Sequence, residues 1–388
     1  MKDEMTSFEE IEEYSVLIPD ANGWEAVKFM RCFSGFNNIK FFLLSNVKNS
    51  IARKCKYCSI FIYKQFHDDI YWLESVIAYC KSYNINFIIP TTEAGFTLLI
   101  NYKNELLKEN IKIPKLPCKE TFELTNNKWL FYNFLVNNKL PVEPALLVGE
   151  QGYIKLKTEK LVEFPFPALV KPASEKGGYG IKYINSIDEF NNYKAALEKK
   201  SFNDIYYMQG FIPGYDVSMA VYCNEGVIYE YAIHKSLNKR TDYFGPQRMM
   251  KFIENKKIFS IAEKCLKELK WDGIACIDFR VDIRDNNPKI IEFNPRFGQA
   301  LLGWYLAGIN FPLIILLDAF GKEYPQMNYK TIKYAHTMAH LKIILKKIIL
   351  RKYAKSLSEY EGGLKFFISD PLPELFFILK KIFIKMKL

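Results

Sequence analysis

The sequence contains no uninterrupted apolar run close to the ~20 residues that a membrane-spanning helix needs. Its start, MKDEMTSFEEIEEY, has neither the basic segment nor the apolar core of a secretory leader. The eight cysteines are scattered singly except for Cys55 and Cys58, and a lone CxxC without a second pair is a poor zinc pattern. We therefore expect a cytoplasmic protein with reduced thiols and no disulfide framework.

The composition is that of an ordered globular protein. Hydrophobic residues make up 49% of the 388, with 31 Phe and 25 Tyr, which is enough apolar surface for two or three packed units. The formal net charge is +11, and residues 341–388 alone hold eleven basic and four acidic residues. The nearly neutral body argues against a nucleic-acid partner, whereas the basic end favours an acidic surface or an anionic membrane as neighbour.

The first part of the chain alternates between two patterns. Short and almost wholly apolar runs are separated by segments of helical period such as 68–83, and the runs occupy 14–19, 39–45, 59–63 and 85–90. Strands buried on both faces and alternating with helices are typical of a parallel sheet. We expect residues 1–115 to form a doubly wound α/β domain of Rossmann type.

A break between Pro114 and Pro117 predicts a boundary, after which a helix runs from Lys128 to about Asn138. Hairpin-like strands and capped helices then indicate a second, α+β domain over 116–325, with one lobe at about 145–212. Residues 326–388 contain two basic amphipathic helices and form a helical tail. Packing on the body, binding a partner and lying on an anionic membrane all remain open for this tail.

A glycine-rich loop follows the apolar strand that ends in Lys171. Gly177, Gly178 and Gly180 precede a second strand at 181–184, so the loop joins two strands and is not a Walker loop, which would enter a helix and carry GK[ST]. Glycines let backbone N–H groups approach an anion closely. The pattern indicates a hairpin flap over phosphates with Lys171 pointing at them, and an ordinary turn is the alternative.

Two carboxylates are expected to face each other across a later hairpin. With a turn centred on Asp285, Asp278 lies opposite Glu292, and position 280 opposite position 290. Two like charges at ~4 Å repel by about 4 kcal/mol at an effective dielectric of about 20. A raised pKa or a bound cation would compensate, and with Asn294 these oxygens describe a site for Mg²⁺ or Mn²⁺. The alternative is a solvated face neutralised by Arg280 and Lys289.

These motifs resemble the ATP-grasp superfamily, especially its carboxylate–amine ligases and carbamoyl-phosphate-synthase-like proteins. The resemblance covers about 14–325 and is most specific at IIEFNPRFG, residues 290–298. It implies that Asp278, Glu292 and Asn294 bind the metal, and that Arg296 contacts the phosphates and an acyl intermediate.

The resemblance also implies an ATP site with further residues. Lys128, Lys171 and the glycine loop would hold the phosphates, while Gln209 stands where the family usually has Glu near the adenine. Phe211 and Ile212 would form the linker beside the adenine, and Asp216 would bind the ribose. In the phosphate loop at 233–248 the cations are Lys235, Lys239, Arg240 and Arg248, with Lys235 and Arg240 as catalytic candidates.

The implied reaction is ATP-dependent amide formation: ATP phosphorylates a carboxylate, an amine displaces phosphate, and ADP is released. The substrates would be small carboxylates and amines, with amino acids and carboxylated sugars as candidates. An ATP-grasp kinase and a non-catalytic ATP-binding module are the alternatives. A homodimer and a monomer both remain open, as does a peripheral position at the inner face of a membrane.

Overall fold

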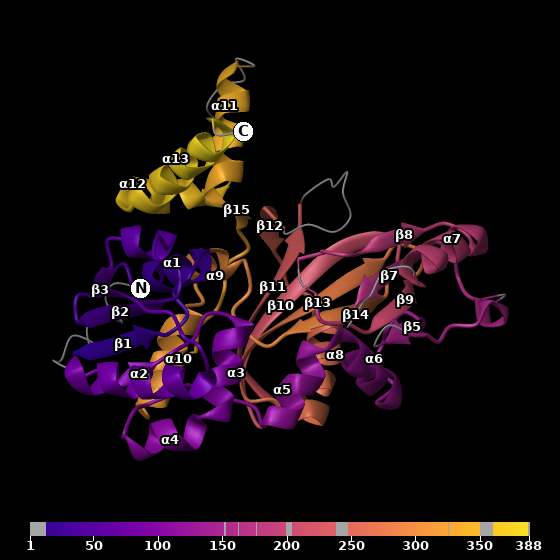
Figure 1. The fold of residues 1–388 in the computed structure, drawn as a ribbon. Helices are drawn as coiled ribbons and strands as arrows, with labels where there is room; N and C mark the ends of the chain where they lie inside the picture. Colours follow the sequence, from indigo (N-terminus) through magenta and orange to yellow (C-terminus); the bar gives the residue numbers. More distant parts are fainter. Residues whose placement is uncertain are drawn as a thin grey trace. The chain divides into compact units, whose positions relative to one another are not determined.

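The structure is a computed structural model that describes residues 13–150, 153–161, 163–175, 177–198, 204–237, 247–324, 326–349 and 360–386 (Figure 1). Backbone contacts divide the chain into two compact units. The first comprises Met1–Leu116, Ala300–Tyr329 and Ala335–Leu388, and the second comprises Pro117–Gln299 with Lys330–Tyr334. Both ends of the sequence therefore belong to the same unit.

The first unit is built on a four-stranded parallel sheet. Its strands are β1 (Tyr14–Ile18), β2 (Ile39–Ser45), β3 (Cys58–Tyr63) and β4 (Phe87–Ile88), in the order β3-β2-β1-β4. The runs fold as strands because their apolar side chains are buried, and Leu17, Leu43 and Ile88 are fully buried. The doubly wound α/β prediction is thus confirmed.

Helices connect or follow these strands. Helix α1 (Trp24–Arg31), the 3₁₀ turn η2 (Ile51–Lys54) and α2 (Asp69–Ser82) lie between successive strands, and α3 (Glu93–Asn101) and α4 (Lys103–Lys108) follow β4. The side chain of Asp68 accepts a bond from the backbone N–H of Tyr71, and that of Thr92 accepts one from Gly95. These caps begin α2 and α3 where the polar residues follow the apolar runs.

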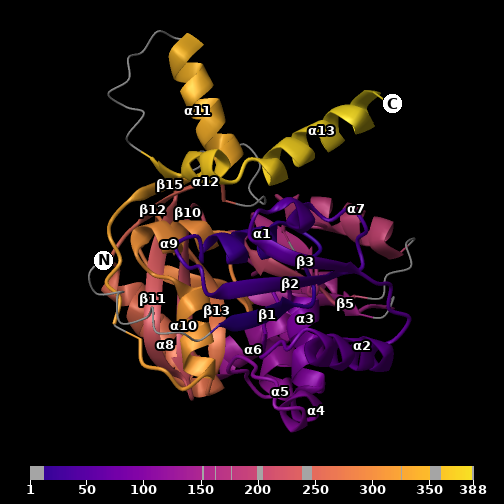
Figure 2. The same cartoon turned by 90° about the vertical axis from the view of Figure 1, so that its left-hand side faces the viewer.

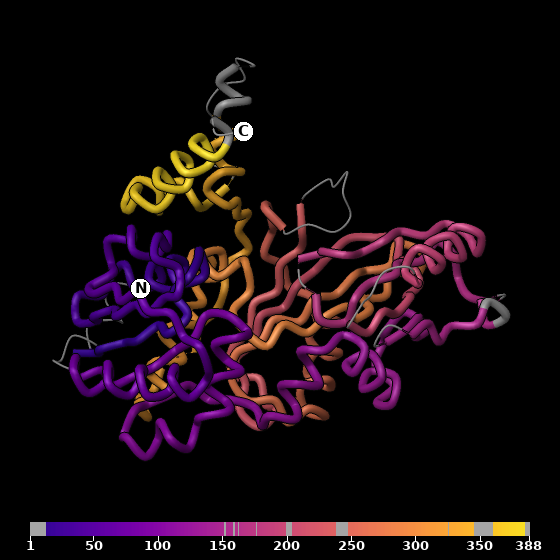
Figure 3. The backbone as a smooth tube through the Cα atoms, viewed as in Figure 1, coloured from indigo at the N-terminus to yellow at the C-terminus, as the bar shows by residue number. Residues whose placement is uncertain are grey.

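Residues 300–329 return to the first unit, which differs from the expected domain at 116–325. Helices α9 (Leu301–Ala307) and α10 (Phe311–Ala319) lie among first-unit elements (Figure 3). The Asn310 side chain donates to the Cys32 carbonyl over 2.8 Å, and the ring of Phe320 lies 5.0 Å from that of Tyr14. The sequence pattern did not reveal this return. Because α10 is apolar on all sides, its pattern does not indicate which element it packs against.

In the part of the chain that the structure describes, no single helix is long and apolar enough to cross a membrane. Helices α9 and α10 pass that test only as a pair, and they are bent by 89° relative to each other. Most of their side chains are buried inside the protein.

The tail also groups with the first unit and is not separate from it. It contains α11 (Thr337–Ile349), β16 (Glu361–Gly362), α12 (Gly363–Ser369) and α13 (Leu372–Met386), shown in Figure 2. Arg31 of α1 binds Asp370 at 3.0 Å and Glu374 at 2.8 Å, and all three side chains are buried. The tail packs here because these opposite charges are buried together. We call the cluster of Arg31, Asp370 and Glu374 the Arg31 clamp.

The second unit contains a smaller antiparallel sheet in the order β6-β5-β9-β7-β8. Val170, Met208 and Phe190 belong to its fully buried core. Its strands are β5 (Ala145–Glu150), β6 (Tyr153–Ile154), β7 (Ala168–Pro172), β8 (Lys182–Ile184) and β9 (Tyr206–Gly210), and its helices are α7 (Ile187–Glu198) and the 3₁₀ turn η3 (Thr158–Leu161).

A larger sheet runs in the order β14-β13-β10-β11-β12-β15-β16, and its first five strands, which belong to the second unit, pair antiparallel. Helix α8 packs against β10 and β11, and the rings of Phe259 and Tyr231 lie 4.8 Å apart. The strands are β10 (Gly214–Asn224), β11 (Val227–Ser236), β12 (Met249–Phe252), β13 (Gly273–Asp282), β14 (Pro288–Asn294) and β15 (Lys333–Ala335), and the helices are α5 (Lys119–Asn126), α6 (Lys128–Asn137) and α8 (Lys256–Leu269).

The β13–β14 hairpin follows the predicted register for only part of its length. Asp278 lies opposite Glu292 as expected, but Arg280 pairs with Lys289 and not with Ile290. A bulge shifts the register directly after Asp278, so Ile291 has no partner across the ladder. Counting from a turn centred on Asp285 is thus wrong by one residue next to the turn, and the bulge at Ile291 restores the predicted pairing at Asp278.

Candidate active site

Asp278 and Glu292 form the centre of the candidate site. They face each other on β13 and β14, and both side chains are partly buried. Removal from water, and then the charge of Glu292, raise the pKa of Asp278 to about 7. The hydroxyl of Ser218 on β10 donates to Asp278 and partly offsets this rise. The repulsion argued from the sequence is therefore present in the folded chain.

Two further groups contact this carboxylate pair. The amide nitrogen of Asn294 donates to Asp278 over 3.0 Å, which leaves the role of ligand to its oxygen. Lys128, at the start of α6, lies 3.1 Å from Glu292 and also donates to the Glu175 carbonyl over 2.6 Å. The helix begins here because the Asn127 side chain caps it. Lys128 thus joins the carboxylate pair to the segment that leads into the glycine loop.

Arg280 and Lys289, which the alternative reading assigned to neutralising these carboxylates, are engaged elsewhere. Arg280 donates to Asp216 over 2.6 Å and to the Ile212 carbonyl over 2.5 Å. Lys289 binds Glu143, with Asp282 at 3.4 Å. The negative charge of the pair is therefore met mainly by Lys128 and, less directly, by Arg296, which tends to lower the pKa of Asp278.

Lys171 and Gln209 form a second cluster on the smaller sheet. The Lys171 ammonium donates to Gln209 over 2.8 Å and lies 5.2 Å from the centre of the Tyr207 ring. Gln209 in turn donates to the Glu143 carbonyl over 3.1 Å. Burial lowers the pKa of Lys171 to about 8, although Glu292 opposes the shift. This lysine is buried without a carboxylate in contact, as a group that awaits an anion would be.

The glycine loop has the backbone that its sequence predicts. Strands β7 and β8 pair antiparallel on either side of it. Gly177, Gly178 and Gly180 have φ values of 65°, 81° and 74°, which side-chain-bearing residues rarely adopt. At Gly180 an added Cβ would also lie 3.0 Å from Pro172. The loop is therefore a glycine-dependent hairpin.

The linker between the two sheets lies beside Asp216 and Arg280. Arg280 lies across the Phe211 ring at 5.4 Å and binds Ile212 and Asp216. A single guanidinium thus ties the linker to the predicted ribose-binding residue. Arg280 on β13 lies opposite Asp216 on β10 because of the register between these strands, which sequence patterns did not reveal.

Of the four cations named in the 233–248 segment, the structure describes Lys235 and Arg248. Lys235 pairs with Val217, on the face of β10 opposite to Ser218, and its ammonium lies 3.4 Å from the centre of the Tyr215 ring. Arg248 is exposed. Lys239 and Arg240 lie outside the described residues.

Two residues that the sequence did not single out as functional lie on the Ser218 face. His234 pairs with Ser218 across β10 and β11, and burial lowers the pKa of its imidazole to about 4. The Gln247 side chain donates to the Ser218 hydroxyl over 3.3 Å. The alternation of Asp216 and Ser218 along one strand could have indicated Ser218, whereas nothing local indicates Gln247.

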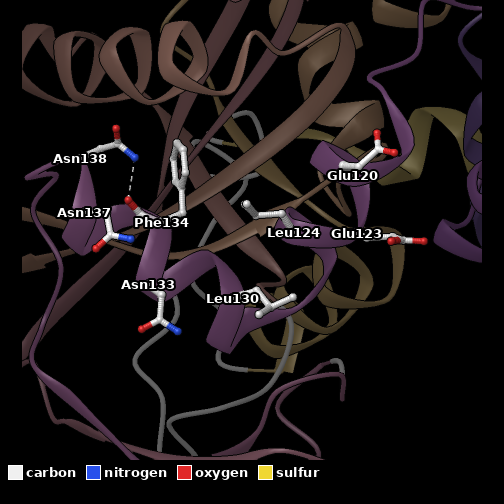
Figure 4. A pocket seen from close by; sticks show the side chains of 8 residues that line it. All are labelled: Glu120, Glu123, Leu124, Leu130, Asn133, Phe134, Asn137 and Asn138. Atoms are coloured by element: carbon white, nitrogen blue, oxygen red, sulfur yellow. Dashed lines mark hydrogen bonds between the residues drawn. The ribbon is translucent and has the colours of Figure 1, made fainter.

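A pocket of about 380 Å³ lies between α5 and α6 (Figure 4). It contains no member of the Asp278–Glu292 pair or of the Lys171 cluster, and we assign it no part in the chemistry. Its lining consists of Glu120, Glu123, Leu124, Leu130, Asn133, Phe134, Asn137 and Asn138.

The sequence profile of the ATP-grasp domain matches residues 125–300. Among curated proteins, the carbamoyl phosphate synthase large chain of Methanothermobacter thermautotrophicus is 25% identical over 194 residues, or 47% of this chain and 18% of that protein. A D-alanine–D-alanine ligase of Aquifex aeolicus is 30% identical over 122 residues, or 30% of this chain and 41% of the ligase. The chain thus spans less than half the length of these relatives.

Solved structures extend the likeness beyond the matched segment. An N5-carboxyaminoimidazole synthetase from Staphylococcus aureus, complexed with ADP, has a TM-score of 0.66 at 15% identity over 91% of both chains. A biotin carboxylase from Campylobacter jejuni has a TM-score of 0.62 at 19% identity, covering 82% of this chain and 74% of that one. At these identities the likeness concerns the fold.

Proposed function

Residues 125–300 form an ATP-grasp domain, and on that premise we propose that the protein is an ATP-dependent carboxylate–amine ligase that releases ADP and phosphate. One observation carries the proposal: Asp278 and Glu292 face each other, with Asn294 bonded to Asp278. A protein that only binds nucleotide has no need for two adjacent carboxylates of like charge. The names of the matched ligases and synthetases support the same reaction class.

We assign the ATP phosphates to the glycine loop, Lys128 and Lys171. Lys171 is buried with a lowered pKa, so an incoming phosphate would restore a charge partner to it. The adenine and ribose are assigned to Gln209, Phe211, Ile212 and Asp216. Because Gln209 already accepts from Lys171 and donates to Glu143, its amide is held in one orientation beside the linker.

The donor set fits a hard divalent cation that is shared with phosphates. In the described part of the chain, no group of three or more His, Cys, Asp and Glu could hold a metal by itself. Two carboxylates and an amide oxygen match the incomplete protein shell that Mg²⁺ takes beside ATP. Asp278, Glu292 and Asn294 would hold the ion, which would reduce the charge repulsion around the transferring phosphoryl group.

The reaction needs two bond exchanges. A carboxylate oxygen of the first substrate attacks the γ-phosphorus, the bond to the ADP oxygen breaks, and an acyl phosphate forms. The amine nitrogen of the second substrate then attacks the acyl carbon, the bond to the phosphate oxygen breaks, and the amide and phosphate are released after the nitrogen loses a proton. Arg296 would stabilise the charge on the phosphoryl oxygens, together with Arg240. The glycine flap would exclude water from the acyl phosphate.

We place this activity in the cytoplasm, because all eight cysteines are free thiols. The substrate class we propose is small carboxylates and amines, with amino acids and carboxylated sugars as the first candidates.

The test is ADP release measured with pools of amino acids and carboxylated sugars, with and without an amine. We expect ADP only when an acid and an amine are both present, and an amide in equal amount. ADP without either substrate would refute a ligase, and a stable phosphorylated product without an amide would identify a kinase. If the protein binds nucleotide but turns over none of the pools, it would be a non-catalytic ATP-binding module.

A further inference from the structure

Helix α13 exposes an unusual apolar surface. Among its described side chains, six large apolar ones are between 43% and 65% exposed; five recur at helical spacing on one side, and the sixth, Ile384, lies on the side of Phe377. We call the five the α13 stripe: Leu372, Leu375, Leu379, Ile382 and Phe383. A helix normally buries such a stripe against its own protein. An exposed contiguous apolar patch marks a surface that binds a partner or a membrane.

The first turns of the helix are nevertheless attached to the first unit. Glu374 is buried against Arg31, and the Phe377 ring lies 5.8 Å from that of Trp24. Lys54 lies over the Phe376 ring at 5.4 Å. In Figure 2 the later turns of α13 extend away from α12, with the label C at their end. These contacts hold the start of the helix, and Leu379, Ile382 and Phe383 lie on the later turns, where they are exposed.

The charges near the stripe indicate which kind of surface it binds. Residues 375–388 contain four lysines and no acidic residue. Lys380 and Lys381 are exposed, and the Lys381 ammonium lies 4.5 Å from the Phe377 ring, which places it on the side of Phe377 and away from the stripe. An apolar face with lysines on the opposite, polar side is the arrangement of a helix that lies in a membrane interface. A second copy would instead bring lysines against lysines with no acid in this segment to pair with them.

We propose that the α13 stripe docks this protein onto an anionic lipid bilayer, with the Arg31 clamp holding the helix to the first unit. Leu379, Ile382 and Phe383 enter the boundary between headgroups and acyl chains. Lys380 and Lys381 remain at the level of the lipid phosphates. This inference is independent of the proposed ligase chemistry, because it uses only residues of the first unit.

The experiment is sedimentation of the full chain with vesicles. Vesicles of phosphatidylcholine mixed with phosphatidylglycerol are compared with vesicles of phosphatidylcholine alone. We expect binding to the anionic vesicles that weakens as salt is raised. The L379S/F383S variant should lose roughly a hundredfold in partition, since each exposed side chain contributes about tenfold on burial. The K380Q/K381Q variant should lose about tenfold or more on anionic vesicles only.

The matched control is I70S/L107S, which removes two apolar side chains that are also exposed on the first unit but lie on α2 and α4. It should bind vesicles like the parent chain. Because all these positions are exposed, circular dichroism and thermal melting should show that each variant is folded.

Several outcomes would overturn the proposal. The parent chain could stay in solution with both kinds of vesicle, or bind both equally well. The control could lose as much binding as L379S/F383S. A dimer that disappears in L379S/F383S, without vesicle binding by the parent chain, would assign the stripe to a second copy. If instead L379S/F383S loses vesicle binding but still forms ADP, the result would support the docking role of the stripe. It would not bear on the proposed ligase activity.

Discussion

Lys171 on β7 and Gln209 on the neighbouring β9 form a buried hydrogen bond of 2.8 Å. The bond gives the ammonium a neutral partner, and the charge of Glu292 offsets only part of the cost of burying it. Burial accordingly lowers the pKa of Lys171 to about 8. The charge that the proposed phosphate site depends on is therefore lost just above neutral pH.

We predict that affinity for ADP, measured by calorimetry in the absence of divalent metal, falls as the pH rises through about 8. Lysine is charged below its pKa, so the attraction to phosphate is present at neutral pH and lost above about 8. The limiting loss is about tenfold per pH unit. Arginine stays charged over this range, so K171R should remove the pH dependence. The same decline in folded K171R would show that another group titrates.

Removing either carboxylate of the central pair should abolish divalent-dependent ADP formation. For D278A and E292A we expect a loss of more than about a hundredfold, the usual cost of removing a group that organises charge in a phosphoryl transfer. Steady-state ADP release at saturating Mg²⁺ measures it. D285N alters an exposed carboxylate in the turn of the same hairpin and should keep full activity. Full activity in D278A or E292A would refute the site.

The Arg280 guanidinium should act on nucleotide binding more than on the chemical step. R280M frees the Ile212 carbonyl and Asp216 together, so we expect KM for ATP to rise about tenfold with a smaller change in kcat. R280K keeps the charge but cannot make both bonds, and an intermediate KM is expected. Equal falls in kcat and in kcat/KM would place Arg280 in the chemistry instead.

Two positions of the glycine loop allow the effect of backbone strain to be separated from that of a steric clash by an added Cβ. Gly177 and Gly180 both have positive φ, but an added Cβ meets nothing within 4 Å at Gly177 and lies 3.0 Å from Pro172 at Gly180. G177A should cost about 1 kcal/mol in loop stability from backbone strain, and G180A more. ATP protection of the loop from proteolysis measures both. Equal protection in G180A and the parent chain would show that the flap does not require this glycine.

The Arg31 clamp should contribute strongly to stability. R31M leaves Asp370 and Glu374 buried without their partner, so the free energy of unfolding of the first unit should fall by about 3–5 kcal/mol. K40M breaks the exposed pair between Lys40 and Glu13 and should change it by less than about 1 kcal/mol. Urea unfolding followed by fluorescence measures both, and a similar small change in R31M would contradict the structural role of the clamp.

Local patterns predicted the strands of the first unit and its helical segment at 68–83, because each depends on residues near in sequence. Counting from a turn centred on Asp285 predicted that Asp278 lies opposite Glu292. In the structure this pairing depends on the bulge at Ile291, which offsets a shift of one residue next to the turn and which no sequence pattern indicated. Ser218 and Arg280 were missed as partners because a pairing between β10 and β13 joins residues about sixty positions apart, and no periodic pattern states which strands are neighbours.

The Arg31 clamp joins residues that are far apart in the sequence. Asp370 follows Arg31 by 339 positions, and Glu374 follows it by 343. A ribosome makes Arg31 long before its acidic partners. During translation the nascent first unit must therefore carry a cation without its eventual counter-charges while the whole second unit is made. The first unit can pack fully only after the second unit has been synthesised.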